Sequence, residues 1–190
     1  MAELTDNIEK CSNHIKLGGL VSFPTETVYG IGANIFDLDA LLSIFKIKQR
    51  PTNNPLIVHI HSFEQIRKLV NISENDIKIV KLITDKFWPG PLTILLPKSD
   101  LVNNIISANT SYVGIRMPAS DLSLELLRKC NLPIAAPSAN KYCHVSPTHY
   151  SHVYQEFRNE PIKILKEKDS KLNIGIESTI IKINFLISNL

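Results

Sequence analysis

Prolines delimit a series of short apolar segments, and this pattern constrains the fold more than any other feature of the sequence. Residues 20–23 are followed by Pro24, and residues 92–96 lie between Pro91 and Pro97. Proline cannot donate a hydrogen bond to a strand ladder and marks turns, so short apolar runs bounded by prolines are typical of buried strands. Further segments of this kind are residues 56–60, 112–117 and 133–136.

Helical patterns alternate with these strands. Four apolar residues near the N-terminus recur at helical spacing and predict an amphipathic helix that ends at Gly18-Gly19. These four residues are Leu4, Ile8, Cys11 and Ile15. Capping residues predict the starts of five further helices, namely Asp37, Ser62, Ser73, Ser120 or Asp121, and Thr148 before residues 150–157. Residues 162–165 and 179–183 are expected to form the last strands.

Strands and helices therefore intermix along the chain, with connections long enough for parallel pairing. This predicts an α/β or α+β fold with one mixed sheet. The 190 residues fit one domain, residues 1–190, since single cores usually extend over roughly 100–200 residues. No apolar run approaches the roughly 20 residues of a membrane helix, and the first ten residues carry three acidic side chains, unlike a signal peptide. We therefore expect a cytoplasmic protein without a membrane segment.

Composition and motifs argue against several classes of protein. Cys11, Cys130 and Cys143 are widely spaced and include no C-x-x-C pair, which favours buried or inert thiols over a disulfide framework or a zinc site. The net charge of +3 is too small to indicate nucleic-acid binding by itself. Motifs of P-loop, dinucleotide-binding, serine hydrolase and zinc protease sites are absent from the sequence.

The first candidate site follows the first apolar strand. Residues 24–32, P-T-E-T-V-Y-G-I-G, contain three hydroxyl groups and one carboxylate. Ligand sites in open α/β sheets favour the ends of strands, and Gly30 and Gly32 would let the backbone approach a ligand closely. The alternative interpretation is an ordinary turn between two elements.

A second candidate consists of Lys46, Lys48 and Arg50, followed by Asn54. If the preceding helix ended before Lys48, an extended backbone would place Lys48 and Arg50 on one face. Pro51 favours an extended conformation at the residue before it. Two cations on one face suit a triphosphate, whereas the alternative is a solvated helix end whose lysines complement the helix dipole.

Two polar residues lie within apolar strands. Arg116 would be costly to bury without an anion, and Glu26, Glu177 or the carboxylate of a ligand could serve as its partner. His59 is expected to be a hydrogen-bonded histidine of the core or of its rim.

Small polar groups form the remaining candidates. Residues 136–140, A-P-S-A-N, together with Ser146 and Thr148, offer hydroxyl and amide groups to phosphates or to a purine edge, although a turn is the alternative. Residues 175–179 place hydroxyls at the start of a strand. Together, the candidates predict a cavity lined by cations and hydroxyls with few general bases, which suits nucleotide binding better than hydrolysis.

Six blocks between about residues 8 and 182 identify a family resemblance. They read S-F-P-T-E-T-V-Y-G-I-G, K-I-K-Q-R-P-T-N-N-P-L-I-V-H-I, F-W-P-G-P-L-T-I-L-L-P-K, V-G-I-R-M-P, A-P-S-A-N and G-I-E-S-T-I. In this order they resemble the YrdC-like threonylcarbamoyl-AMP synthases. The resemblance implies a twisted, mostly open α/β sheet around a large basic cavity.

The resemblance also implies a reaction in which L-threonine, bicarbonate and ATP give L-threonylcarbamoyladenylate and pyrophosphate. Mg²⁺ would be held mainly by the phosphates, and no protein metal site is implied. A separate threonylcarbamoyl transferase would then modify an adenosine of tRNA, and direct contact of this chain with tRNA is a further expectation.

Site roles implied by the resemblance fall into three overlapping sets. The K-x-R and S-x-N motifs give the catalytic set, Lys48, Arg50, Ser138 and Asn140. The ATP-binding set is Lys48, Arg50, Asn54, Asn140, Ser146 and Thr148. The set for threonine and its carbamate is Thr27, His59, Arg116, Ser138 and Ser178.

One feature departs from the family pattern. Relatives usually continue through another strand to an R-P-G segment whose arginine contacts ATP, whereas no arginine follows Arg158 here. The alternatives are a replacement elsewhere in the chain, weaker ATP binding, or an inactive shortened paralogue. Two other functions compete with the synthase interpretation: a non-catalytic protein that binds tRNA or double-stranded RNA, and a carbamoyl-adenylate former of the hydrogenase-maturation type.

Overall fold

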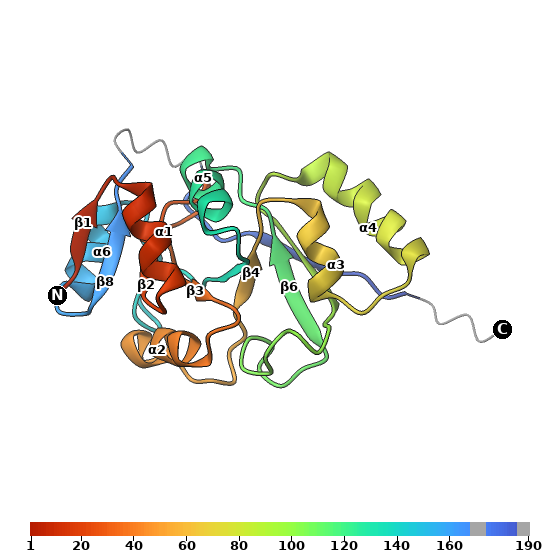
Figure 1. Cartoon of the computed structure of the whole chain (residues 1–190), viewed down its shortest axis with the longest axis horizontal. Helices are drawn as coiled ribbons and strands as arrows, with labels where there is room; N and C mark the ends of the chain where they lie inside the picture. Colours follow the sequence, from red (N-terminus) through yellow and green to blue (C-terminus); the bar gives the residue numbers. More distant parts are fainter. Residues whose placement is uncertain (168–173, 186–190) are drawn as a thin grey trace.

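The proline-bounded segments form strands of a mixed sheet in the computed structural model, which describes residues 1–167 and 174–185 (Figure 1). The strands are β1 (Glu3–Thr5), β2 (Leu20–Phe23), β3 (Gly30–Asn34), β4 (Ile57–His59), β5 (Leu92–Pro97), β6 (Tyr112–Arg116), β7 (Ile134–Ala135), β8 (Ile162–Leu165) and β9 (Thr179–Lys182). The helices are α1 (Ile8–Lys16), α2 (Leu38–Lys48), the 3₁₀ helix η1 (Phe63–Gln65), α3 (Ile66–Leu69), α4 (Glu74–Phe87), α5 (Asp121–Cys130) and α6 (Tyr150–Phe157). The mixed α/β class predicted from the sequence is confirmed.

The strand order determines which loops meet. Among the described residues the order is β1-β8-β2-β3-β7-β4-β6-β5-β9, with both parallel and antiparallel neighbours. The short strand β7 pairs with β3 on one side and with β4 on the other. The loop after β7 therefore lies beside β3. Parallel pairing of β4 with β6 places His59 opposite Arg116.

Helices cover the two faces of the β2–β3 region. Alternation along β2 directs Leu20 into one buried cluster and Val21 into another. The second cluster lies between α1, α5 and β2 and includes Ile15 and Leu127. The first and larger cluster includes the apolar face of α2.

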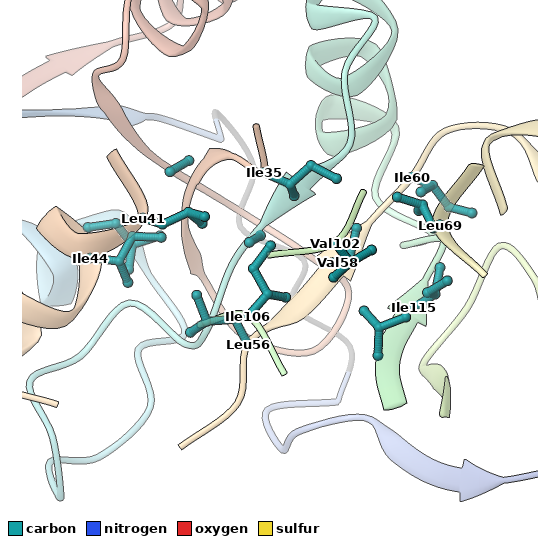
Figure 2. Close-up of a cluster of buried hydrophobic side chains, with 14 of the residues drawn as sticks. Ile35, Leu41, Ile44, Leu56, Val58, Ile60, Leu69, Val102, Ile106 and Ile115 are labelled. Atoms are coloured by element: carbon teal, nitrogen blue, oxygen red, sulfur yellow. The ribbon is translucent and has the colours of Figure 1, made fainter. Parts of the chain in front are cut away.

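Figure 2 shows this larger cluster, in which Leu41 and Ile44 of α2 belong to the same buried set as Val58 of β4. Ile106, from the loop between β5 and β6, lies next to Leu56 in this view. All five side chains are at most 2% exposed. The core therefore extends from α2 beneath the central strands and fixes the segment that carries the K-x-R motif.

Helix starts follow the predicted caps with two exceptions. The Asp37 side chain accepts a hydrogen bond from the Ala40 amide, and Ser73 and Ser120 act in the same way. Ser62 forms the predicted capping box with Gln65, but before a 3₁₀ helix. The cap of α6 is His149, so the prediction of Thr148 was wrong. The imidazole of His149 accepts a hydrogen bond from the Ser151 amide and so acts as the cap that was expected of the Thr148 hydroxyl.

The N-terminal helix is shorter than predicted. Leu4 lies in β1, and α1 begins at Ile8 after the N-cap Asn7. The helical spacing from Leu4 was misleading because β1 is held by parallel pairing with β8, a partner far away in the sequence. The helix ends before Gly18, as predicted, and Gly18 adopts a φ of +83° that favours glycine.

Two further expectations concern the cysteines and the membrane. Cys11 and Cys130 are buried, and burial raises the pKa of Cys11 to about 11. Cys143 is a free, exposed thiol. Within the described ranges, none of the helices has the length and apolarity needed to span a bilayer.

Candidate active site

Backbone hydrogen bonds draw four separate segments together around one pocket. The Tyr29 amide donates to the carbonyl of Pro147 at 2.8 Å, and the Tyr29 carbonyl accepts from the Ala139 amide at 2.7 Å. The Gly175 amide donates to the Thr27 carbonyl at 3.2 Å. Polar clusters that the sequence analysis treated separately therefore meet at the turn after β2.

The pocket contains the whole set of residues assigned to threonine and its carbamate. Its lining consists of Thr25, Thr27, Val28, Tyr29, Gly30, Ile57, His59, Arg116, Ala136, Pro137, Ser138, Glu177 and Ser178. Five of these residues were selected from the sequence, namely Thr27, His59, Arg116, Ser138 and Ser178. They come from β4, β6 and three different loops, so the fold brings together residues up to about 150 positions apart.

Thr25 organises the turn that forms one wall of the pocket. Its buried hydroxyl donates to the Val28 carbonyl at 2.7 Å and accepts from the amides of Thr27 and Val28, each at 3.2 Å. The hydroxyls of Thr25 and Thr27 are 2.8 Å apart. Local side-chain bonds of this kind are typical of threonine in tight turns. They hold the Thr27 hydroxyl beside Arg116.

Arg116 is the charged centre of the pocket, and its structural partner is Glu26. The guanidinium Nη2 donates to Glu26 Oε1 at 2.6 Å and to Thr27 Oγ1 at 3.1 Å, and Nε donates to the Gly90 carbonyl at 3.3 Å. The side chains of Arg116 and Glu26 are only 5% and 10% exposed. The second carboxylate oxygen of Glu26 accepts from the Ala119 amide at 3.0 Å. Arg116 is therefore held in place before any ligand binds.

His59 lies next to Arg116 and is held in its neutral form. Its ring nitrogen Nδ1 donates to the Ile57 carbonyl at 3.2 Å, and its ring packs edge-on against Phe23. Burial, reinforced by the positive charge of Arg116, lowers the pKa of His59 to about 3. A neutral imidazole can orient a bound ligand by hydrogen bonding, but it cannot supply a positive charge at neutral pH.

This shift predicts a contribution of His59 to the pH dependence of stability. The unfolded chain takes up a proton near pH 6.5, whereas the folded chain does so only near pH 3, so folding becomes less favourable as pH falls through this window. Between pH 7 and pH 5 we expect His59 to lower the free energy of unfolding by about 2 kcal/mol. Urea unfolding at both pH values measures this. A His59→Gln variant lacks this titrating group, so its free energy of unfolding should fall by about 2 kcal/mol less between pH 7 and pH 5 than that of the wild type. Equal losses in the two proteins would contradict a buried, neutral His59.

Ser138, Ser178 and Glu177 also line the pocket. The Ser178 hydroxyl lies 2.7 Å from the hydroxyl of Thr93 on β5. Glu177 accepts a hydrogen bond from the hydroxyl of Ser146. Ser146 also lines a second pocket, which lies between residues 143–147 and the α6 side chains.

Lys48 is placed differently from the sequence prediction. The helix α2 runs through Lys48, and Gln49 ends it in the left-handed conformation at φ 53°. The predicted extended arrangement of Lys48 and Arg50 on one face was therefore wrong. Pro51 restricts the backbone of Arg50 alone, so the helix can continue through Lys48 and end at the left-handed Gln49. Lys48 is 1% exposed, and burial beside Arg50 lowers its pKa to about 7.

The other residues assigned to ATP lie around the pocket and not in its lining. Arg50 is half-buried and donates to the carbonyls of Asn54 and Pro55 at 3.4 and 3.0 Å. The Asn140 amide group donates to the carbonyls of Lys141 and His144, and its buried oxygen Oδ1 has no hydrogen-bond partner among the described residues. Thr148 is partly buried and follows Pro147, whose carbonyl holds Tyr29.

Sequence reasoning missed three pocket residues as members of the site. Thr25 and Tyr29 belong to the T-E-T-V-Y-G block but were assigned no role, and Glu177 was considered only as a partner for Arg116. The cluster of three hydroxyls after a buried strand was the available signal. Their arrangement depends on contacts with residues 138–147 and 175, which the sequence pattern does not specify.

Metal ligands are not a feature of this site. Within residues 1–167 and 174–185, no group of three or more His, Cys, Asp or Glu side chains is arranged to hold a metal ion.

Comparisons with known proteins place this chain in a family. The family model Sua5_yciO_yrdC, described as "Telomere recombination", matches residues 13–187. Among solved structures, the crystal structure of Pyrococcus abyssi Sua5 complexed with L-threonine superposes with a TM-score of 0.87 at 39% identity, covering 96% of this chain and 54% of that one. The chain belongs to the Sua5/YciO/YrdC family.

The curated relatives of this chain include threonylcarbamoyl-AMP synthases. The threonylcarbamoyl-AMP synthase of Pyrococcus abyssi is 43% identical over 174 residues, which cover 92% of this chain and 50% of that protein. The putative threonylcarbamoyl-AMP synthase of Methanocaldococcus jannaschii is 33% identical, with coverage of 93% and 80%. The chain spans half or slightly less of the first three curated relatives it matches.

Proposed function

We propose that this chain is an L-threonylcarbamoyladenylate synthase. Threonine and bicarbonate form a carbamate on the threonine amine with loss of water. A carbamate oxygen then attacks the α-phosphorus of ATP, so that a new P–O bond forms and pyrophosphate leaves. This is a nucleotidyl transfer, and it requires positioning and charge neutralisation more than a nucleophilic side chain.

The observation that carries this proposal is the composition of one pocket. All five residues that match the family's threonine positions line it, although they come from separate parts of the chain. A pocket assembled in this way from five separately matched positions is hard to explain by a structural role alone.

Threonine recognition follows from the groups in the pocket. Arg116 would bind the α-carboxylate through the donors that Glu26 and Thr27 leave free. Thr27, Ser178 and neutral His59 are suited to bind the threonine hydroxyl and the carbamate. A buried polar partner for the hydroxyl would reject an analogue that lacks this group far better than an apolar pocket does.

ATP would lie between the threonine pocket and the second pocket. Arg50 is suited to the phosphates, and the unpartnered amide oxygen of Asn140 to a donor of the nucleotide. Ser146 and Thr148 would contribute hydroxyl donors. Mg²⁺ would enter with ATP as part of the substrate, held mainly by the phosphates.

The product defines the partners that we expect. A threonylcarbamoyladenylate is a reactive mixed anhydride, so a transferase that acts on tRNA would consume it, with or without direct contact between tRNA and this chain. A cytoplasmic site of action is consistent with that role.

Threonine binding without nucleotide tests the proposed pocket. Calorimetric titration of the protein with L-threonine should show binding, and L-valine, which has the same shape without the hydroxyl, should bind at least 100-fold more weakly. Equal binding of the two amino acids, or no binding of threonine, would contradict the assignment of this pocket.

A further inference from the structure

Lys48 is bound to the S-x-N segment by both its side chain and its backbone. Its ammonium donates to the carbonyl of Ser138 at 2.5 Å and also to the carbonyl of Asn140. Its own carbonyl accepts from the Tyr142 amide at 2.8 Å. Three contacts therefore connect the last turn of α2 to residues 138–142.

The opposite side of the same segment is held by the first candidate loop. The Ala139 amide donates to the Tyr29 carbonyl, and Ser138 forms a bridge with Gly30. On that side the segment uses the Ala139 amide and the Pro137 carbonyl, which accepts from the Ile31 amide at 3.0 Å, and not the carbonyls of Ser138 and Asn140. Lys48 thus satisfies the pair of carbonyls that β3 does not reach.

Withdrawal of the Lys48 ammonium would leave these carbonyls without their partner. Lys48 is 1% exposed, and Asn140 is 6% exposed. A buried carbonyl without a partner costs roughly 1–3 kcal/mol. An ammonium that also had to bind a phosphate would lose contacts that shape the site. The half-buried Arg50 uses Nε and Nη2 for the carbonyls of Asn54 and Pro55 and has five N–H donors in all.

We propose that Lys48 is a positioning residue, which fixes residues 138–140 so that the Ser138 hydroxyl faces the threonine pocket, and does not contact the nucleotide. The proposal rests on the proposed function for the identity of the ligands. The fixing of the segment itself does not depend on it. Removal of a lysine that binds phosphate directly would weaken the binding of ATP alone. Removal of a positioning lysine would also weaken the binding of threonine in the absence of nucleotide.

The test compares Lys48→Met, which keeps the length of the side chain without its donors, with Lys46→Met on an exposed position of the same turn. Hydrogen exchange of the Ala139 and Tyr142 amides should accelerate at least tenfold in Lys48→Met and remain unchanged in Lys46→Met. Affinity for L-threonine alone should fall at least tenfold in Lys48→Met. Unchanged exchange and threonine affinity in folded Lys48→Met, with an increase only in KM for ATP, would overturn the proposal.

A measurement on the wild type covers the case in which Lys48→Met does not fold. Reductive methylation followed by peptide mass spectrometry should modify Lys46 and spare Lys48, both with and without MgATP. Rapid modification of Lys48 that MgATP suppresses would identify it as a nucleotide ligand and overturn the proposal. Because neither exchange nor methylation requires turnover, an absence of pyrophosphate release from the wild type would contradict the synthase assignment and not the position of Lys48.

Discussion

Replacing Arg116 with alanine is expected to abolish threonine-dependent activity and to lower the free energy of unfolding by about 3–5 kcal/mol. The substitution removes the partner of Glu26, which is 10% exposed, and leaves a buried carboxylate without its cation. It also removes the donor to Thr27 Oγ1 at 3.1 Å. Loss of activity and loss of stability therefore have one cause, the position of this cation between a structural carboxylate and the proposed substrate carboxylate.

A matched control is available on the surface. Arg67 pairs with Glu74 through the same groups, but its side chain is 49% exposed and that of Glu74 is 72% exposed. Pairs as exposed as this one contribute little to stability, so Arg67→Ala should unfold in urea almost as the wild type does. Equal stability of the Arg116→Ala and Arg67→Ala variants, or retained threonine-dependent turnover in Arg116→Ala, would contradict the central role of this pair.

Replacing Arg50 with alanine is expected to reduce ATP-dependent turnover by about 100–1,000-fold, the cost of removing one donor that stabilises charge in a transition state. Unlike Arg116, Arg50 is half-buried, and among the described residues its side chain donates to the carbonyls of Asn54 and Pro55 alone. The fold should therefore survive, and threonine binding without nucleotide should be unchanged.

Pyrophosphate release and calorimetric titration with threonine measure these two effects separately. Lys46→Met, on the exposed side of the same helix end, is the matched control and should retain turnover. An Arg50→Ala variant with normal turnover would remove Arg50 from the ATP site. A variant that also lost threonine binding would indicate that Arg50 acts through the structure of the pocket.

Most of the described strands and most helix starts could be predicted from the sequence because local chemistry decides them. Strand β3 (Gly30–Asn34) was missed, because it lies in the segment that was interpreted as a loop. Pro91 and Pro97 limit β5, and the side chain of Asp37 caps α2 within three residues of its own position. Strand β1 could not be predicted, since it depends on parallel pairing with β8, more than 150 residues later. The order of strands has the same origin, because β7 pairs between β3 and β4 only in the folded chain.

The site was predictable in its residue types and not in their pairing. Arg116 was expected to meet an anion, but the choice between Glu26 and Glu177 depends on how the turn at residues 24–29 reaches the end of β6. Lys48 was assigned to phosphates from its spacing to Arg50. Its contacts with Ser138 and Asn140 involve backbone carbonyls about 90 residues away. Every residue has a backbone carbonyl, so a sequence pattern cannot indicate which of them a lysine binds.

Pyrophosphate release is the measurement that tests the central claim most directly. The purified protein is mixed with ATP, Mg²⁺, L-threonine and bicarbonate, and each component is left out in turn. We predict release that requires both threonine and bicarbonate, because the carbamate must form before it can attack the α-phosphorus. Release that is independent of threonine, or no release from folded protein that still binds threonine, would contradict the synthase assignment.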